Sequence, residues 1–124
     1  MRTLYLMDWR GTLSTLPDPV AVIKALQAAG HYVVMHSNSS HDIAANAAFQ
    51  ACDDVLSKLT ATVEKALLVK QAMKEHGLEA VVMVDDDRGD ILPTLFKFHN
   101  IDMAKITIEE LELPAHVWKS QLEK

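Results

Sequence analysis

Short apolar runs alternate with longer amphipathic stretches along this chain. Continuous apolar runs occupy residues 4–7, 32–35 and 80–84, and each run ends in polar residues. Uninterrupted hydrophobicity over such a short length is typical of a strand that is buried on both faces, as in a parallel sheet. Residues 54–57 predict a short edge strand, and residues 104–108 predict a last strand.

Helical patterns fill the stretches between these runs. Pro17-Asp18-Pro19 is expected to open a helix that stops at Gly30. Four more helices are predicted: about 41–51; from Thr60 or Thr62 to about Glu75, with Gly77 after it; 90–98, with Pro93 in its first turn; and a helix within 109–124 that docks through Val117, Trp118 and Leu122. Strands alternating with helices predict one α/β domain over residues 1–124, built on a parallel sheet.

Composition narrows the class of protein. The chain of 124 residues is 49% apolar, which excludes a disordered protein, and its net charge is −5 with scattered basic residues. A nucleic-acid partner is therefore not favoured. The single Cys52 allows no intramolecular disulfide and suggests a reducing compartment. Because no apolar run is long enough to span a bilayer, we expect a cytoplasmic protein without a membrane partner.

Polar residues follow three of the predicted strands at the point where each strand ends. They are Asp8, then Ser37-Asn38, then residues 85–87, which are all aspartate. Ligands of open α/β sheets bind outside the carboxyl ends of the strands, so these residues are expected to converge. Carboxylates crowded together repel one another, and a divalent cation relieves that repulsion. Oxygen ligands without Cys or paired His favour Mg²⁺.

The order of these motifs resembles the haloacid dehalogenase superfamily of hydrolases. The first motif of that family is a strand ending in Asp-x-Asp-Gly-Thr, and residues 8–13 read Asp-Trp-Arg-Gly-Thr-Leu. The second motif matches residues 33–38, and the fourth matches residues 84–90. The third motif is a lone lysine, for which Lys65 is the first choice, 21 residues ahead of Asp86, and Lys58 the second.

The resemblance implies a Rossmann-like three-layer sandwich with a central sheet of about five strands, and hydrolysis of a phosphate ester through an aspartyl-phosphate. Asp8 would attack phosphorus. In the family pattern Mg²⁺ would be held by Asp8, the backbone carbonyl of Arg10 and Asp86, with Asp90 in support. Phosphate would be bound by Ser37, the Asn38 backbone amide and Lys65, and Lys65 would also pair with Asp8. Asp85 and Asp87 are expected to be solvated or to cap a helix.

Arg10 departs from the family pattern. The phosphatases of the family carry there the aspartate that serves as general acid and base, whereas a guanidinium stays protonated. Three interpretations remain open: a phosphatase with an undemanding leaving group or with another acid such as His36; a catalytically impaired relative that binds a phosphorylated ligand or a partner protein; or another reaction on the same scaffold.

The spacing of the motifs leaves no room for a cap domain. Only 24 residues lie between Thr12 and Ser37, and one helix and one strand use them. An open site suits a phosphorylated small molecule or macromolecule, or a homo-oligomer in which a neighbour closes the cleft. Trp118 and the C-terminal segment are candidates for such an interface.

Overall fold

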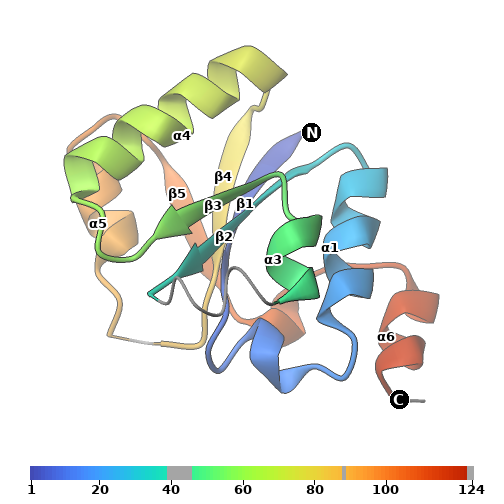
Figure 1. Ribbon diagram of the computed structural model, residues 1–124. Coiled ribbons are helices and arrows are strands. Elements are labelled where there is room, and N and C mark those ends of the chain that lie inside the picture. Colours follow the sequence, from blue (N-terminus) through green and yellow to red (C-terminus); the bar gives the residue numbers. More distant parts are fainter. Residues whose placement is uncertain (39–45, 88, 123–124) are drawn as a thin grey trace.

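The computed structural model describes residues 1–38, 46–87 and 89–122. Within them, five strands form one all-parallel sheet in the order β3-β2-β1-β4-β5 (Figure 1). The strands are β1 (Thr3–Asp8), β2 (Tyr32–Ser37), β3 (Asp54–Ser57), β4 (Ala80–Val84) and β5 (Met103–Ile106). The predicted α/β class and parallel sheet are thereby confirmed.

Helices cover both faces of the sheet. They are α1 (Pro19–Ala28), α3 (Ala47–Ala51), α4 (Thr62–His76), α5 (Leu92–Lys97) and α6 (Ala115–Leu122), with 3₁₀ turns η1 (Leu13–Thr15) and η2 (Ile108–Glu110). Figure 1 shows α4 and α5 on one face and α1, α3 and α6 on the other. This layering is compatible with a Rossmann-like sandwich.

Alternate residues of each strand supply two separate hydrophobic clusters. Leu4 and Leu6 of β1 belong to the cluster under α4 and α5, whereas Met7 belongs to the cluster under α1 and α6. The same alternation holds along β2, where Val34 faces α4 and Met35 faces α1. A period of two is what the pleat of a strand imposes. Both faces are apolar, which explains the continuous runs in the sequence.

Helix boundaries follow local chemistry more closely than periodicity. Asp18 caps α1 by accepting a hydrogen bond from the backbone N–H of Ala21 at 3.3 Å. Gly77 ends α4 with φ of +64°, a left-handed conformation that suits glycine. α4 begins at Thr62, one of the two expected starts, and Ala61 occupies the N-cap position without a side-chain bond.

Other boundaries shift by a few residues. The expected helix start at 41 lies outside the described residues, and α3 begins at Ala47. α5 is shorter than 90–98 but has Pro93 in its first turn, as predicted. β5 ends before Thr107, because Thr107 and Glu110 form a capping box that opens η2 instead of continuing the strand.

The last helix docks as expected, but with a different end residue. Val117 is buried and Trp118 packs against the same cluster, whereas Leu122 is exposed. The buried residue at this end is Gln121, whose side chain exchanges two hydrogen bonds with the backbone of Asp18 at 2.8 and 2.9 Å. These bonds tie α6 to the start of α1. No helix among the described residues is long and apolar enough to cross a membrane.

Candidate functional site

The site lies at the carboxyl edge of the sheet, where strand alternation carries polar side chains beyond the core. Four side chains stand two residues after a member of the cluster under α4: Asp8 after Leu6, His36 after Val34, Lys58 after Leu56 and Asp85 after Met83. The strand ladders continue into two of these positions, since Lys58 N–H donates to Ser37 O and Asp85 N–H donates to Ile106 O, both at 3.0 Å. Because residues two apart share a face of the sheet, alternation puts all four positions on the α4 side.

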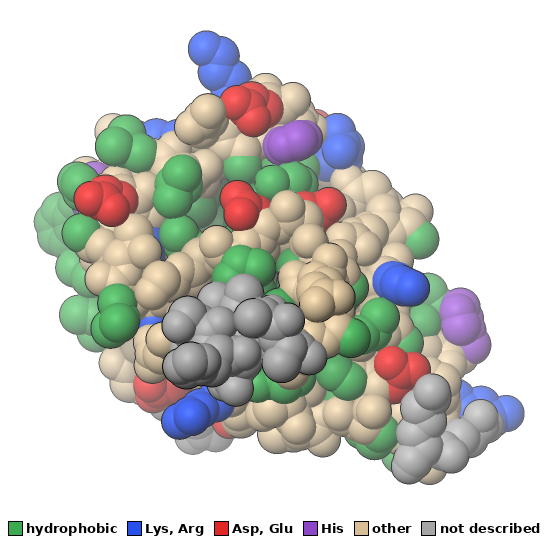
Figure 2. All heavy atoms as spheres, viewed as in Figure 1, with side chains coloured by type: hydrophobic (Ala, Val, Ile, Leu, Met, Phe, Trp, Pro, Cys, Tyr) green, Lys and Arg blue, Asp and Glu red, His purple; other side chains and the backbone are tan. Residues whose placement is uncertain are grey.

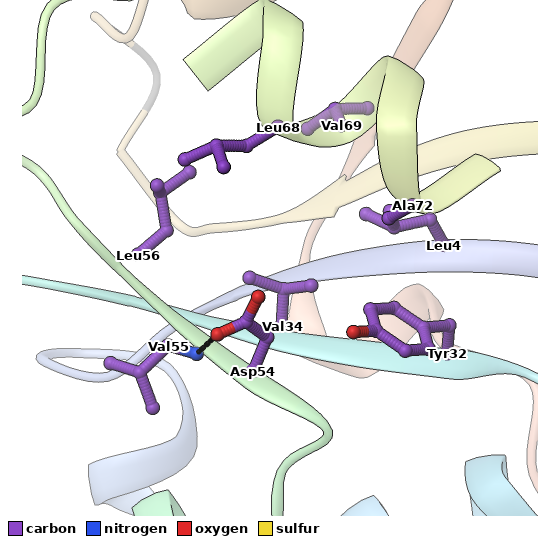
Figure 3. A pocket seen from close by; sticks show the side chains of 9 residues that line it. All are labelled: Leu4, Tyr32, Val34, Asp54, Val55, Leu56, Leu68, Val69 and Ala72. Atoms are coloured by element: carbon purple, nitrogen blue, oxygen red, sulfur yellow. Dashed lines mark hydrogen bonds between the residues drawn. The ribbon is translucent and has the colours of Figure 1, made fainter. Parts of the chain in front are cut away.

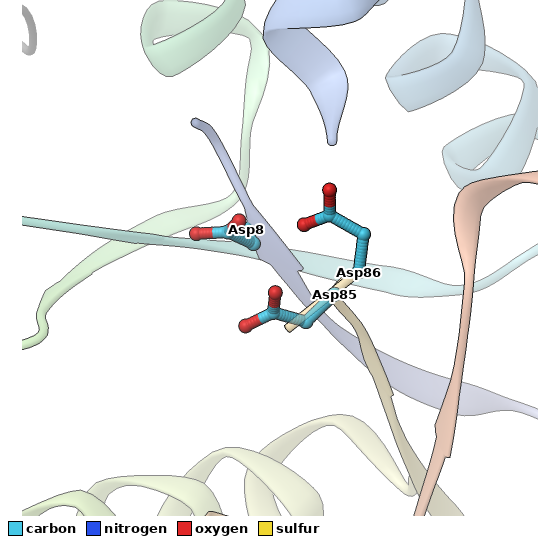
Figure 4. Close-up of side chains that lie close together, drawn as sticks. All are labelled: Asp8, Asp85 and Asp86. Atoms are coloured by element: carbon cyan, nitrogen blue, oxygen red, sulfur yellow. The ribbon is translucent and has the colours of Figure 1, made fainter. Parts of the chain in front are cut away.

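Three carboxylates form the acidic part of the site. One oxygen each of Asp8, Asp85 and Asp86 lies within 4.8 Å of the others. Figure 4 shows these side chains together at the ends of β1 and β4. The Thr12 hydroxyl lies 3.2 Å from Asp8 Oδ2 and 3.4 Å from Asp86 Oδ1, and so links the two strand ends.

Gly11 has a specific role in this arrangement. Its φ is +73°, and a Cβ at this position would lie only 2.9 Å from Asp86 Oδ2. Any side chain at position 11 would therefore strain the backbone and displace a carboxylate of the site. This explains in physical terms why glycine follows Arg10.

Asp85 does not lie in solvent, although this was expected from the sequence. It is only 2% exposed, so it is not solvated, and its Oδ1 accepts a hydrogen bond from Asp87 N–H at 2.9 Å. Burial raises the pKa of Asp85 to about 6, opposed by the Asp87 hydrogen bond and reinforced by the negative charge of Asp8. Asp87 is exposed, as expected, and accepts a hydrogen bond from Gly89 N–H at 2.8 Å.

The acidic group has the donor chemistry for Mg²⁺. It offers carboxylate oxygens from three residues in a partly buried position, which suits a hard divalent cation. Asp90 is not a member of the group. Its Oδ1 accepts a hydrogen bond from Leu92 N–H at 2.8 Å at the start of α5. Asp90 is thus placed to act on the site through its charge.

Lys58 makes the contact with Asp8 that was expected of Lys65. Lys58 Nζ forms a salt bridge with Asp8 Oδ1. Lys65 is 5% exposed, and its Nζ donates to the backbone carbonyl of Lys58 at 3.0 Å. The reason is position: Lys58 follows β3 directly at the carboxyl edge, whereas Lys65 reaches back from the first turn of α4. Burial lowers the pKa of Lys65, while the charge of Asp90 opposes that shift.

His36 is buried beside these charges. It is 3% exposed, and neither ring nitrogen has a hydrogen-bond partner among the described residues. Burial, with the positive charges of Lys65 and Lys58, lowers the pKa of His36 to about 3. The ring is therefore neutral near pH 7, and the single N–H of a neutral imidazole is a very weak acid. His41 lies outside the described residues.

Arg10 lines the pocket next to the nucleophile candidate. One small pocket is bounded by Asp8, Arg10, Ser37, Asn38 and Lys58. Arg10 and Asn38 are exposed, whereas Ser37 is buried at the end of β2. Across the described part of the chain, the guanidinium of Arg10 has neither a salt bridge nor a hydrogen bond to another residue. The structure therefore brings the predicted phosphate-binding residues Ser37 and Asn38 to the same place as Asp8.

A larger apolar hollow lies away from this site. It has a volume of about 140 Å³ and lies between strands β1, β2 and β3 and the middle of α4, as Figure 3 shows. Its lining residues include Leu4, Tyr32, Leu68 and Ala72, and none of them belongs to the acidic group or its lysines. The charged side chains that could take part in a reaction line the small polar pocket and not the hollow. The small pocket is therefore the better candidate for a reaction site.

Compared with known proteins, the chain matches no family model, no curated protein and no solved structure. The resemblance to the haloacid dehalogenase superfamily thus depends on the sequence motifs and stays a prediction. A functional assignment depends on the geometry of the site itself.

Proposed function

We propose that the protein is a Mg²⁺-dependent phosphohydrolase in which Asp8 forms an aspartyl-phosphate. The observation that carries this proposal is the buried carboxylate of Asp8, paired with Lys58 and grouped with Asp85 and Asp86. A carboxylate with this little exposure loses much hydration, and the Lys58 ammonium places an opposite charge against it. A carboxylate attacks phosphorus in its ionised form.

The neighbouring groups prepare Asp8 for an anionic substrate. Asp8, Asp85 and Asp86 would hold Mg²⁺, with the backbone carbonyl of Arg10 as a further oxygen ligand and Asp90 in support. When bound, the cation would neutralise charge on the carboxylates and on the phosphoryl oxygens. This charge balance allows an anionic nucleophile to approach an anionic phosphate.

Ser37, Asn38 and Lys58 form the phosphate-binding side of the pocket. Lys58 contacts Asp8 and also lines the pocket, so its ammonium can bridge the nucleophile and a phosphoryl oxygen. Lys65 acts as a positioning residue, because its bond to the Lys58 carbonyl fixes the segment that carries Lys58. Positioning of this kind is a large part of catalysis in phosphoryl transfer.

The test is hydrolysis of a chromogenic aryl phosphate with Mg²⁺ by the wild type, Asp8→Asn and Lys58→Met. Asp8→Asn removes the nucleophile and is expected to lower kcat by at least about 10³-fold. Asp102→Asn is the matched control, since Asp102 is exposed at the opposite edge of the sheet, just before β5. Wild-type activity that survives Asp8→Asn would rule the nucleophile out.

Binding without turnover is the second candidate function. It is favoured by one residue of the pocket, because Arg10 stands where the family pattern has the general acid and base. On this account, beryllofluoride with Mg²⁺ raises the melting temperature of the wild type and not of Asp8→Asn, while no phosphate ester or anhydride is hydrolysed. Measurable hydrolysis that depends on Asp8 would exclude it.

A further inference from the structure

One stripe of exposed side chains runs along the outer side of α4. It consists of Val63, Leu67, Lys70 and Lys74, which are all exposed and are spaced four, three and four residues apart. At 3.6 residues per turn, this spacing places the four side chains on one face of the helix. The stripe, called the α4 stripe below, is therefore apolar over its first half and basic over its second half.

The apolar half begins close to the candidate pocket. Lys58 lines that pocket, and Leu59, which follows it directly, is 83% exposed. Val63 in the first turn of α4 is 52% exposed, and Leu67 in the second turn is 63% exposed. Figure 2 shows hydrophobic side chains over this part of the surface. Single exposed apolar side chains are common, whereas several together mark an interaction surface.

The basic half lacks a compensating charge on its own helix. Lys70 and Lys74 are four residues apart, so their ammonium groups repel each other. The positions three and four residues from either lysine hold no carboxylate, and neither lysine forms a salt bridge within the described chain. Anionic groups of a partner would relieve this repulsion. The basic half is thus complementary to acidic side chains.

The length of the α4 stripe fits a short extended segment. Val63 and Lys74 are 11 residues apart in the sequence, which corresponds to about 16 Å along a helix. Neighbouring members of the stripe are separated by about 4.5 to 6 Å along the helix axis. In an extended chain, side chains on the same side recur about every 6.6 Å. Alternate residues of one extended segment can therefore meet the four positions in turn.

We propose that the α4 stripe binds an extended segment of a phosphorylated protein, with apolar residues nearest the phosphorylated residue and acidic residues beyond them. The proposal rests on the proposed function, because the pocket of Asp8 and Lys58 would take the phosphate. A linear segment is favoured over an anionic membrane, since the exposed surface of α4 also carries Glu64 and Glu75 and the chain has a net charge of −5. A segment can follow the stripe, whereas a flat anionic surface would also meet these carboxylates.

The test uses synthetic phosphopeptides with the intact chain. Two peptides carry phosphoserine, then two leucines and then two glutamates at alternate positions, one peptide for each chain direction. Matched peptides have serine in place of the leucines or lysine in place of the glutamates. Hydrolysis with Mg²⁺ gives kcat/KM, and fluorescence anisotropy with Asp8→Asn measures binding without turnover. An aryl phosphate, which is too small to reach the α4 stripe, reports on the pocket alone.

The variants are Leu67→Ser, the double variant Lys70→Glu with Lys74→Glu and, as a control for reversal of a surface charge, Lys24→Glu, which lies exposed on α1. In one chain direction the wild type should prefer the glutamate peptide over the lysine peptide by roughly tenfold. The double variant should invert this preference, and Leu67→Ser should remove the preference for leucine over serine. All three variants should hydrolyse the aryl phosphate like the wild type.

The same preferences for all peptides in the wild type and the double variant would overturn the proposal, as would an equal change of preference in Lys24→Glu. Binding to vesicles that contain phosphatidylglycerol, lost in the double variant and without any peptide preference, would overturn it in favour of a membrane surface. Either result leaves the proposed function standing if hydrolysis of the aryl phosphate depends on Asp8. Hydrolysis that survives Asp8→Asn would instead remove the proposed function, while the anisotropy measurement still tests the α4 stripe.

Discussion

Single residues at the strand ends decide what this site can do. Asp8, His36, Lys58 and Asp85 extend the α4-facing rows of their strands, so charged and polar side chains lie where apolar ones would continue the core. Lys58 partners Asp8 and Lys65 partners the Lys58 backbone. His36 is the exception, because its buried ring has no hydrogen bond within the described chain.

His36 therefore predicts a pH dependence of stability. Its folded-state pKa of about 3 lies below the ordinary value of 6.5, so the unfolded chain binds more protons between these values. The free energy of unfolding should fall as the pH is lowered from about 6.5 toward 3. His36→Phe removes both the titration and two unpaired ring nitrogens.

Urea unfolding at several pH values measures this effect. The variant should lose less stability than the wild type over the acidic range and should be at least as stable at pH 7. His116→Phe is the control, because His116 is exposed at the start of α6. An unchanged acid dependence in His36→Phe would show that the ring is not held neutral in the folded protein.

Part of the arrangement at these strand ends could be predicted from the sequence and part could not. Asp8, Ser37 and Asn38 could be placed because each follows a strong apolar run. The positions of Lys58 and Asp85 were harder to predict, since the apolar run of β3 is weak and three adjacent aspartates look alike in the sequence. Leu56 and Met83 are the last residues of β3 and β4 in the cluster under α4, and counting two residues on from each gives Lys58 and Asp85, because the strand pleat continues past the apolar run.

At the scale of elements, the parallel sheet positions the site and α4 covers one side of it. The strands were predictable because their two-sided burial leaves continuous apolar runs. The helix ends were less predictable, because they depend on a few specific hydrogen bonds, such as those of Thr107 and Gln121. The cover provided by α4 is incomplete near β3, where the apolar hollow of about 140 Å³ remains (Figure 3).

Filling that hollow should stabilise the fold. Ala72 lies on the inner side of α4 and lines the hollow, so Ala72→Leu places more apolar surface against the sheet. We expect the free energy of unfolding to rise by about 1 kcal/mol. Lys70→Leu, on the exposed side of the same helix, is the matched control. A loss of stability in Ala72→Leu with no effect of the control would mean that the helix packs closer to the sheet than described.

At the scale of the whole molecule, exposed apolar side chains mark the surfaces that are open to contact with other molecules. The expectation of a homo-oligomer through Trp118 stays a prediction, and Trp118 packs against its own core. Four exposed large apolar side chains lie on and just before α4, and Figure 2 shows hydrophobic side chains over that part of the surface. They are Leu59, Val63, Leu67 and Leu68.

The acidic group predicts that Mg²⁺ stabilises the molecule. A ligand at about 100 times its Kd adds about 2.7 kcal/mol to the free energy of unfolding. Asp86→Asn weakens metal binding but also relieves repulsion, so this variant should be at least as stable as the wild type in EDTA and less stable in Mg²⁺. Asp87→Asn is the control, since Asp87 lies next in the chain but outside the group. Equal Mg²⁺ responses in Asp86→Asn and the wild type would argue against the metal site.

The central claim is that Asp8 carries phosphate covalently during turnover. The most direct measurement is an acid quench of the Mg²⁺ enzyme during reaction with acetyl phosphate or an aryl phosphate, followed by peptide mapping by mass spectrometry. We expect a hydroxylamine-sensitive phosphoryl group on the peptide that contains Asp8, absent from Asp8→Asn and accumulating most where the second step is slow. Turnover with the phosphoryl group on another residue, or with an Asp8 peptide that is never modified in a rapid quench, would contradict the account.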